Sequence, residues 1–246
     1  MSDAPALDVF PAPLRLVAAG MEPDALAELA DRTGIGIELD PEPAGRVEAV
    51  GEGEAERLAE ALNRRSAAVV EVVAGRAFPA DRLRAAMAEG CRLFLSLSTR
   101  MAWSFDTAAQ FCDALAVRGL LPDYLRHDVE LSLHEAVVNA VLHGNLAMGG
   151  SLVDDPAEFD AFCQRLTARL AEGEGATKRV ELAAFGESGL LVLRVHDEGA
   201  GYDPELVPRP VDITAKSGRG LEIMRTMSAR MEVTDGGRTV ALAFAL

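Results

Sequence analysis

The sequence has few cysteines and no long apolar stretch. Its three cysteines, Cys91, Cys112 and Cys163, form neither a CxxC pair nor a cluster with histidine, which argues against a disulfide framework and a structural zinc site. No apolar run approaches the ~18 residues that span a bilayer, and the first ten residues show no basic segment followed by an apolar one. We therefore expect a cytoplasmic protein without a signal peptide, whose thiols are reduced and mostly buried.

Basic residues are also scarce. The chain has 24 Lys and Arg against 39 Asp and Glu, a net charge of −15, and only Lys178 and Lys216 are lysines. Nucleic-acid binders normally carry a basic patch, so neither nucleic acid nor an anionic membrane is an expected partner. Apolar residues make up 49% and charged residues 26% of the 246 residues, which is typical of a folded protein with one large domain or two small ones.

Residues 1–95 are predicted to form a small α/β domain, because strand and helix patterns alternate after a proline-containing start. The rhythm faintly resembles a receiver domain. However, no paired acids follow the first strand and no aspartate ends the apolar strand 67–73, so we expect a regulatory or dimerising module without phosphoacceptor chemistry. The predicted strands are 14–19, 35–39, 46–50, 67–73 and 92–98, and the predicted helices are 22–32, 54–65 and 80–89.

Residues 96–246 are predicted to form a second domain, after a break near residues 90–103. Helices come first, followed by a hairpin, a long loop, a helix and a closing hairpin, which favours a mostly antiparallel sheet covered by helices on one face, an α/β sandwich. The predicted helices are 106–117, 124–143, 157–171 and 220–231, and the predicted strands are 178–185, 190–195, 232–234 and 239–245.

The predicted helix 124–143 ends in the segment Glu135-Ala-Val-Val-Asn-Ala-Val-Leu-His-Gly144. Glu135 and Asn139 are four residues apart and therefore project from one side, and His143 continues the stripe. The carboxamide oxygen of Asn139 can coordinate Mg²⁺, which prefers oxygen ligands and binds together with phosphates. The carboxylate of Glu135 can accept a proton from an attacking hydroxyl or water. Taken alone, the pair is more typical of an ordinary polar contact on a solvated face.

A second segment, Asp197-Glu-Gly-Ala-Gly201, lies where an apolar strand opens into a loop. Gly199 and Gly201 allow the backbone to approach a ligand closely or to adopt a positive φ. The carboxylate of Asp197 can accept a hydrogen bond from an exocyclic amine such as that of adenine. By itself the segment is also compatible with a plain turn, because a lone GxG is a weak signal.

A third segment, Lys216-Ser-Gly-Arg-Gly-Leu221, opens a predicted helix. The free N–H groups and the dipole of a helix start form a ready anion or phosphate site, and Lys216 could add a point charge. A loop without a ligand is the alternative. The dinucleotide-binding fingerprint fails because these glycines follow a long loop rather than a strand, and no Walker GxxxxGK[ST] motif is present.

In this order the three segments resemble the boxes of the Bergerat (GHKL) ATP-binding fold, over about Ser98–Leu246. Residues 135–144 resemble the N box, 197–201 the G1 box and 218–221 the G2 box. Within that fold, the ExxxNxxxHG form and the short GRGLEIMRTM segment resemble the anti-sigma-factor serine/threonine kinases. The resemblance implies a Bergerat-type α/β sandwich, bound ATP and Mg²⁺, and a protein partner. That partner would be an anti-anti-sigma (STAS-type) protein phosphorylated on serine, or a sigma factor.

The resemblance also implies a role for each matching residue. Asn139 would ligate Mg²⁺, Glu135 would be the general base for the partner hydroxyl, and Asp197 would bind the adenine amine. Residues 202–217 would form a mobile lid. The nucleotide contacts that the resemblance implies are Asn139, His143, Asp197, Gly199, Gly201, Lys216, Gly218, Arg219, Gly220 and Leu221.

Two departures from the family pattern leave other functions open. Residues 148–177 hold an extra helix (157–171), and the first ~90 residues have no place in a minimal family member. A non-catalytic, nucleotide-dependent module that binds a partner is therefore an alternative, as is a homodimer. A sensor histidine kinase fits less well, because it needs a phosphoacceptor histidine on a helical hairpin upstream of the ATP domain. The four histidines, by contrast, lie at 127, 134, 143 and 196.

Overall fold

The computed structural model describes residues 13–148, 156–202 and 219–246. Its strands are β1 (Arg15–Ala19), β2 (Gly36–Ile37), β3 (Arg46–Gly51), β4 (Ala68–Val72), β5 (Leu93–Ser98), β6 (Arg179–Glu187), β7 (Leu190–Asp197), β8 (Arg230–Thr234) and β9 (Thr239–Ala245). Its α-helices are α1 (Pro23–Thr33), α2 (Ala55–Asn63), α3 (Ala80–Ala88), α4 (Thr99–Ser104), α5 (Thr107–Val117), α6 (Arg126–Asn139), α7 (Pro156–Glu172) and α8 (Arg219–Met227). Short 3-10 turns are η1 (Pro43–Gly45), η2 (Asp123–Leu125), η4 (Glu174–Thr177) and η5 (Asp235–Gly237), and η3 (Ala140–Asn145) is a π-helix.

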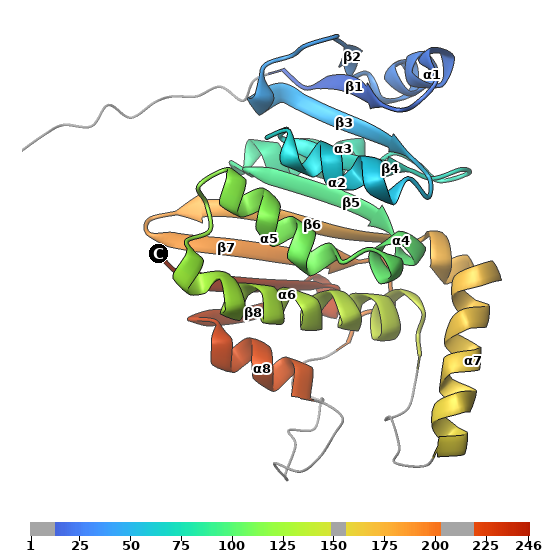
Figure 1. Cartoon of the computed structure of the whole chain (residues 1–246), viewed down its shortest axis with the longest axis vertical. Coiled ribbons are helices and arrows are strands. Elements are labelled where there is room, and N and C mark those ends of the chain that lie inside the picture. Colours follow the sequence, from blue (N-terminus) through green and yellow to red (C-terminus); the bar gives the residue numbers. More distant parts are fainter. Residues whose placement is uncertain (1–12, 149–155, 203–218) are drawn as a thin grey trace, which may run out of the picture.

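All the strands belong to one mixed sheet with the order β2-β1-β3-β4-β5-β6-β7-β9-β8 (Figure 1). The pairings from β2 to β5 are parallel, and those from β5 to β8 are antiparallel. At the junction, Phe94 of β5 is in register with Ala68 on one side and with Ala183 on the other. The fold class is the predicted α/β sandwich with a mixed sheet. The predicted domain boundary at residues 95 and 96 falls inside β5, and the two-domain division stays a prediction.

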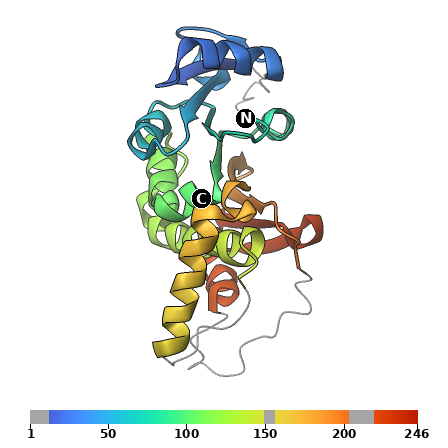
Figure 2. The same ribbon diagram turned by 90° about the vertical axis from the view of Figure 1, so that its right-hand side faces the viewer.

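Helices α2, α5, α6 and α8 lie on one face of the sheet, whereas α1 and α3 lie on the other face of the parallel half (Figures 1 and 2). The alternation of a strand explains both layers. Along β5, Leu93, Leu95 and Leu97 point into the core under α2, α5 and α6, and Phe94 points into the core that α1 and α3 share. The helix α7 stands beyond the strand ends, next to α4 (Figure 1).

One half-buried arginine joins the two halves on the α2–α5 face. The Arg118 guanidinium donates to the carbonyl oxygens of Leu62 and Ser66, each at 2.8 Å, and to that of Ala114 on its own helix, also at 2.8 Å. Helix ends expose carbonyl groups that need partners, and here the residue directly after α5 supplies the partner for the end of α2. The helix layer is therefore continuous across the sheet junction.

The cysteines are unpaired, as predicted. Burial raises the pKa of Cys91 to about 11 and that of Cys112 to about 12, so both thiols stay protonated at neutral pH. In the described part of the chain, no helix is long and apolar enough to cross a membrane.

Three local predictions differ from the structure. The predicted strand 35–39 is reduced to β2, which is short and lies at the open edge of the sheet. The predicted helix 220–231 ends at Met227, because residues from Arg230 onward pair with β9. The helix α4 was not predicted, since its six residues carry no helical apolar repeat. Its start is fixed by Ser98, whose side chain accepts a hydrogen bond from the Met101 backbone N–H.

Candidate functional site

The carboxylate and amide predicted to act together lie at the end of α6. Glu135 and Asn139 are both half-buried and occupy the last turn of this helix. The chain then widens into the π-helix η3, in which the Leu146 N–H donates to the Val141 carbonyl at 2.9 Å. Single π-turns of this kind are frequent at functional sites. The four-residue spacing that places Glu135 and Asn139 on one side of α6 therefore ends at Asn139. His143 lies in the π-helix beyond it.

The first turn of α8 packs directly against these two side chains. A Cβ added to Gly220 would lie 2.6 Å from Glu135 Oε2 and 3.3 Å from Asn139 Nδ2. A side chain at this position would have to push the Glu135 carboxylate aside. The positive end of the α8 dipole therefore faces a carboxylate and an amide, which is a favourable place for further anions and their counter-ions.

The loop that follows β7 packs against the end of the same α6–η3 unit. A Cβ on Gly144 would lie 2.5 Å from the carboxylate carbon of Asp197, and a Cβ on Gly199 would lie 2.4 Å from the Gly144 carbonyl oxygen. The Gly199 N–H donates to Asp197 Oδ1 at 2.8 Å. These glycines let two backbone segments and one carboxylate occupy a space with no room for side chains.

The last described residues of this loop, Gly201 and Tyr202, lie against the turn between β8 and β9. Gly201 has a φ of +75°, and a Cβ there would lie 2.0 Å from the Gly236 carbonyl oxygen. On the other side of the contact, a Cβ on Gly237 would lie 2.2 Å from the Tyr202 backbone nitrogen. Gly201 therefore combines a left-handed backbone with a contact that a side chain would block.

Asp197 is a buried carboxylate with an unusual protonation equilibrium. It is 8% exposed, and burial raises its pKa from 3.8 to about 6. The hydrogen bond from the Gly199 N–H and the charges of Arg238 and Lys178 oppose this rise. At neutral pH the ionised side chain is thus a hydrogen-bond acceptor in a partly dry setting, suited to a ligand amine.

We expect nucleotide affinity to fall at acid pH for this reason. If the ionised Asp197 accepts a hydrogen bond from the adenine amine, protonation through a pKa of about 6 would remove part of the binding-competent protein. Affinity should be constant above pH 7 and about tenfold lower at pH 5. Calorimetric titration at several pH values measures this, and the Asp197→Asn variant provides the baseline for titration of the nucleotide itself. A wild-type profile identical to that of the variant would contradict the role.

The same carboxylate should lower the stability of the nucleotide-free protein. A folded-state pKa above the ordinary value stabilises the fold only at low pH, fully below about 3.8, and this contribution is lost as the pH rises through about 6. We therefore expect Asp197→Asn to melt a few degrees higher than wild type at pH 8, with a smaller difference at pH 5, while its preference for ATP over GTP falls. Asp31→Asn, an exposed change on α1, is the control. A lower melting temperature for Asp197→Asn at pH 8 would contradict this account.

The site suits Mg²⁺ held jointly with a nucleotide rather than by protein alone. No group of three or more His, Cys, Asp or Glu side chains able to hold a metal ion occurs in residues 13–148, 156–202 and 219–246. Mg²⁺ commonly takes one or two protein oxygens and completes its shell with phosphate and water. The side-chain amide of Asn139, whose Nδ2 is its atom nearest to Gly220, carries one such oxygen and could meet that requirement.

The remaining predicted contacts have varied positions. His143 is exposed in η3, with Nδ1 3.1 Å from the Met148 carbonyl oxygen. Arg219 is exposed at the first residue of α8. Leu221 packs against the hydrophobic core, which leaves its backbone as the part able to face a ligand. Lys216 and Gly218 lie outside the described residues, as does most of the predicted lid 202–217.

Asn145 is a site residue that the sequence did not reveal. It follows Gly144 directly. In the structure it is 4% exposed, and its Oδ1 accepts the Glu198 N–H at 2.8 Å, which fixes the residue after Asp197. No sequence signal distinguishes this side chain from an ordinary helix-ending asparagine.

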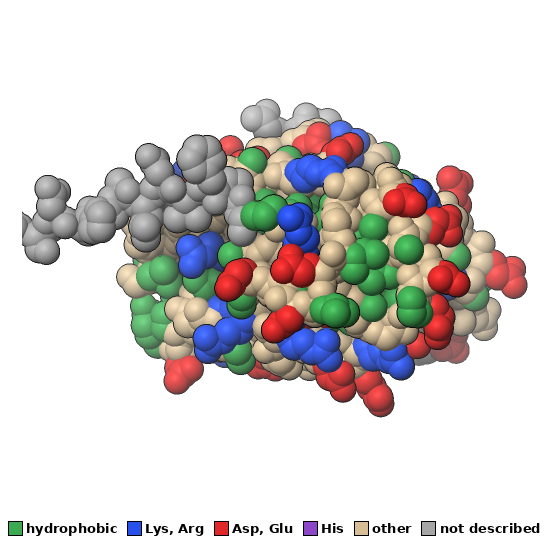
Figure 3. Space-filling model, turned by 90° about the horizontal axis from the view of Figure 1, so that it is seen from above, with side chains coloured by type: hydrophobic (Ala, Val, Ile, Leu, Met, Phe, Trp, Pro, Cys, Tyr) green, Lys and Arg blue, Asp and Glu red, His purple; other side chains and the backbone are tan. Residues whose placement is uncertain are grey.

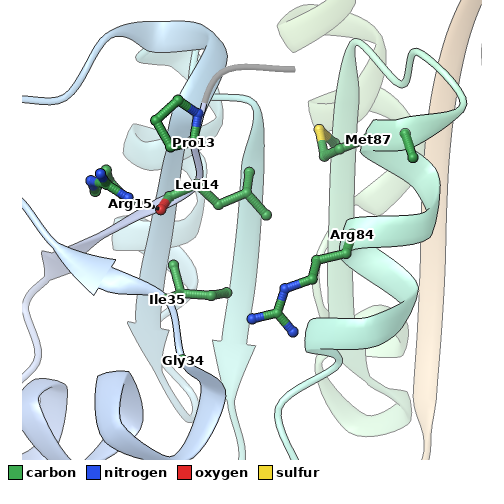
Figure 4. Close-up of a pocket in the computed structure, with 8 residues that line it drawn as sticks. Pro13, Leu14, Arg15, Gly34, Ile35, Arg84 and Met87 are labelled. Carbon is green, nitrogen blue, oxygen red and sulfur yellow. Dashed lines mark hydrogen bonds between the residues drawn. The ribbon is translucent and has the colours of Figure 1, made fainter. Parts of the chain in front are cut away.

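A separate cavity of about 350 Å³ lies in the N-terminal part, between the start of β1 and α3 (Figure 4). None of the predicted nucleotide residues lines it. Its two arginines are already engaged, Arg15 with Glu38 at 3.3 Å and Arg84 with Asp81 at 3.5 Å. The surface seen from this end mixes acidic and basic side chains without a field of one sign (Figure 3). Nothing here competes with the α6–α8 site for an anionic nucleotide.

Comparison with known proteins agrees with this location. Residues 165–244 match the family model described as the histidine kinase-like ATPase domain, which indicates an ATP-binding domain of the GHKL type. The match spans part of α7, all of β6, β7, α8 and β8, and all but the last residue of β9, and thus includes Asp197 and Gly220. It leaves out α6, so only the packing of Glu135 and Asn139 against Gly220 places these two residues in the site. No curated protein matches the chain.

Proposed function

We propose that the protein is an ATP- and Mg²⁺-dependent serine/threonine protein kinase of the anti-sigma-factor type. The observation that carries the proposal is the packing of Gly220 against Glu135 and Asn139. A potential proton acceptor and a potential metal ligand thereby flank a helix start suited to phosphate. A protein that only bound nucleotide would not need the Glu135 carboxylate beside the start of α8.

The chemistry assigned to the chain is positioning and proton transfer. Bound nucleotide and metal would supply the transferred phosphoryl group and neutralise its charge. Asn139 would hold the metal, and Asp197 would orient the adenine. As the partner's serine oxygen bonds to the γ-phosphorus, the bond from that phosphorus to the bridging oxygen of the departing ADP breaks, and Glu135 takes the serine proton.

A serine acceptor on a partner is favoured over a histidine of the chain itself. His127 and His134 are exposed on α6, within the site helix rather than upstream of it. His196 is buried on β7, where burial lowers its pKa to about 4 and Nδ1 lies 2.8 Å from the Thr239 hydroxyl. None of these histidines is on a separate helical hairpin that could present it to the site.

The test is phosphoryl transfer from γ-labelled ATP to purified anti-anti-sigma (STAS-type) proteins, with and without Mg²⁺. We expect a labelled serine that requires the metal and disappears when that serine is changed to alanine. ATP binding without transfer to any such protein would instead support a non-catalytic module that binds a partner. An acid-labile label on the chain itself would support histidine kinase-like chemistry.

A further inference from the structure

Glu198 lies between Gly199 and Asp197, the residue whose carboxylate is proposed to bind adenine. It contacts segments that are far away in the sequence. Its carboxylate accepts the Arg179 backbone N–H at 2.8 Å, at the start of β6. The same carboxylate pairs with the guanidinium of Arg76, in the turn after β4 of the parallel half. Its backbone N–H donates to Asn145 of η3 at 2.8 Å. Three separate parts of the fold therefore hold this one residue.

Two of these ties continue into a buried polar network. The Asn145 amide nitrogen donates to the Thr99 hydroxyl at 2.8 Å and to the Arg179 carbonyl at 2.9 Å. The Arg179 side chain, 3% exposed, donates to the Glu71 carbonyl at 2.6 Å and to the Ala77 carbonyl at 3.4 Å. Arg179 thus binds the chain on both sides of the turn that carries Arg76, at Glu71 before it and at Ala77 after it.

The network reaches the carboxyl ends of the neighbouring parallel strands. The buried Glu71 carboxylate accepts the Ser98 N–H at 2.6 Å, at the end of β5, and the Gly53 N–H at 3.3 Å, after β3. Arg179 Nε is buried without a partner, but Glu71, Asn145 and the terminal nitrogens of Arg179 are all hydrogen-bonded, and a buried network of this extent favours one arrangement. The turn after β4 is therefore fixed at its base and presents Arg76 at its tip.

The pair between Arg76 and Glu198 itself is accessible. The two side chains are 34% and 36% exposed, so solvent screens the pair and its share of the overall stability is small. Its position gives it another consequence, because the Asp197 N–H is held by the Arg238 carbonyl at 3.0 Å on one side. Glu198 is the corresponding hold on the other side. Release of Glu198 would loosen the backbone on the C-terminal side of Asp197.

We infer that Glu198 is a positioning residue of the nucleotide site, and that Arg76 makes nucleotide affinity depend on the turn after β4 of the parallel half. The inference rests on the proposed nucleotide function. It gives the N-terminal part a physical route to the site, since a partner or ligand that displaces Arg76 would weaken nucleotide binding. Loss of the pair removes one of the three ties on Glu198 and loosens the loop, so the expected change is weaker binding.

The test compares full-length Arg76→Ala and Glu198→Gln with Glu89→Gln. Glu89 pairs with Arg194 across the same sheet junction but away from the loop, at 52% and 38% exposure, and provides the matched control. For both test variants we expect ATP affinity to fall about fivefold or more, with a smaller preference for ATP over GTP. The melting temperature should change by less than about 2 °C. Arg76→Lys, which keeps the charge, should restore most of the affinity, and the double variant should be no worse than either single one.

A second readout needs no nucleotide. In the apo protein, Arg76→Ala should speed amide hydrogen exchange in a peptide covering residues 195–201 and leave residues 239–245 unchanged. Wild-type exchange and wild-type affinity in Arg76→Ala would overturn the inference. If Arg76→Ala exchanges faster but the wild-type protein binds no ATP, the proposed function is wrong, whereas the positioning contact of Glu198 is supported. An equal loss of affinity in Glu89→Gln would also overturn it, since the effect would then be general.

Discussion

Asn139→Ala is expected to lose Mg²⁺-dependent ATP binding while the protein stays folded. Asn139 is the half-buried amide beside Gly220, and nothing on an alanine could replace its oxygen toward a metal ion. We expect affinity for ATP with Mg²⁺ to fall about 100-fold, equivalent to about 2.7 kcal/mol. Affinity measured without Mg²⁺ should change little. Titration calorimetry in both conditions measures the two values.

Two further variants separate a metal ligand from a packing residue. Asn139→Asp keeps an oxygen at the same place and should retain a clear Mg²⁺ effect. Asn63→Ala removes an exposed asparagine at the end of α2, whose Nδ2 donates only along its own helix to Ala59, and should bind as wild type does. If Asn139→Ala binds ATP with an unchanged response to Mg²⁺, the metal role is wrong.

Glu135→Gln is expected to keep nucleotide binding and lose phosphoryl transfer. The amide preserves the size of the side chain and its contact with Gly220, but it cannot take the proton of an attacking serine. Positioned general bases contribute roughly 10²–10⁴-fold, so the single-turnover rate should fall within that range while the Kd for ATP stays near wild type. Rapid-quench measurement of phosphoryl transfer to the partner protein gives the rate.

The control for this change lies on the neighbouring helix. Glu222→Gln alters an exposed carboxylate of α8 that pairs with Arg225 at 4.0 Å, and should leave the rate unchanged. Glu135→Asp moves the carboxylate back by one methylene and should give an intermediate rate. Transfer at the wild-type rate by Glu135→Gln would remove Glu135 as the base and leave the site as a binding module.

The separate segments of the site could be predicted from the sequence, because each has a local signature. A carboxylate and an amide four residues apart share a helix side, and glycines mark places where backbones approach closely. The structure brings these segments together through Gly144 against Asp197 and Gly220 against Glu135. Their convergence depends on sheet topology, which is why the order of the three boxes carried more information than any one of them.

Other features depended on contacts that no local pattern encodes. The sequence showed β5 as one more strand, yet this strand joins a parallel to an antiparallel half. The end of α8 was misplaced because pairing of Arg230–Thr234 with β9 overrides helix propensity. The π-helix η3 and the buried role of Asn145 arise from packing around Asp197 and Glu198. Polar side chains of this kind resemble surface residues until their neighbours are known.

Calorimetric titration of ATP into the full-length protein, with Mg²⁺ and then with a chelator in its place, tests the central claim most directly. The account predicts one saturable site per chain whose affinity falls when the metal is withdrawn, with ATP preferred over GTP. Absence of binding at millimolar ATP in the presence of Mg²⁺ would contradict it. The meeting of α6, α8 and the Asp197 loop would then have to serve contacts with a protein partner alone.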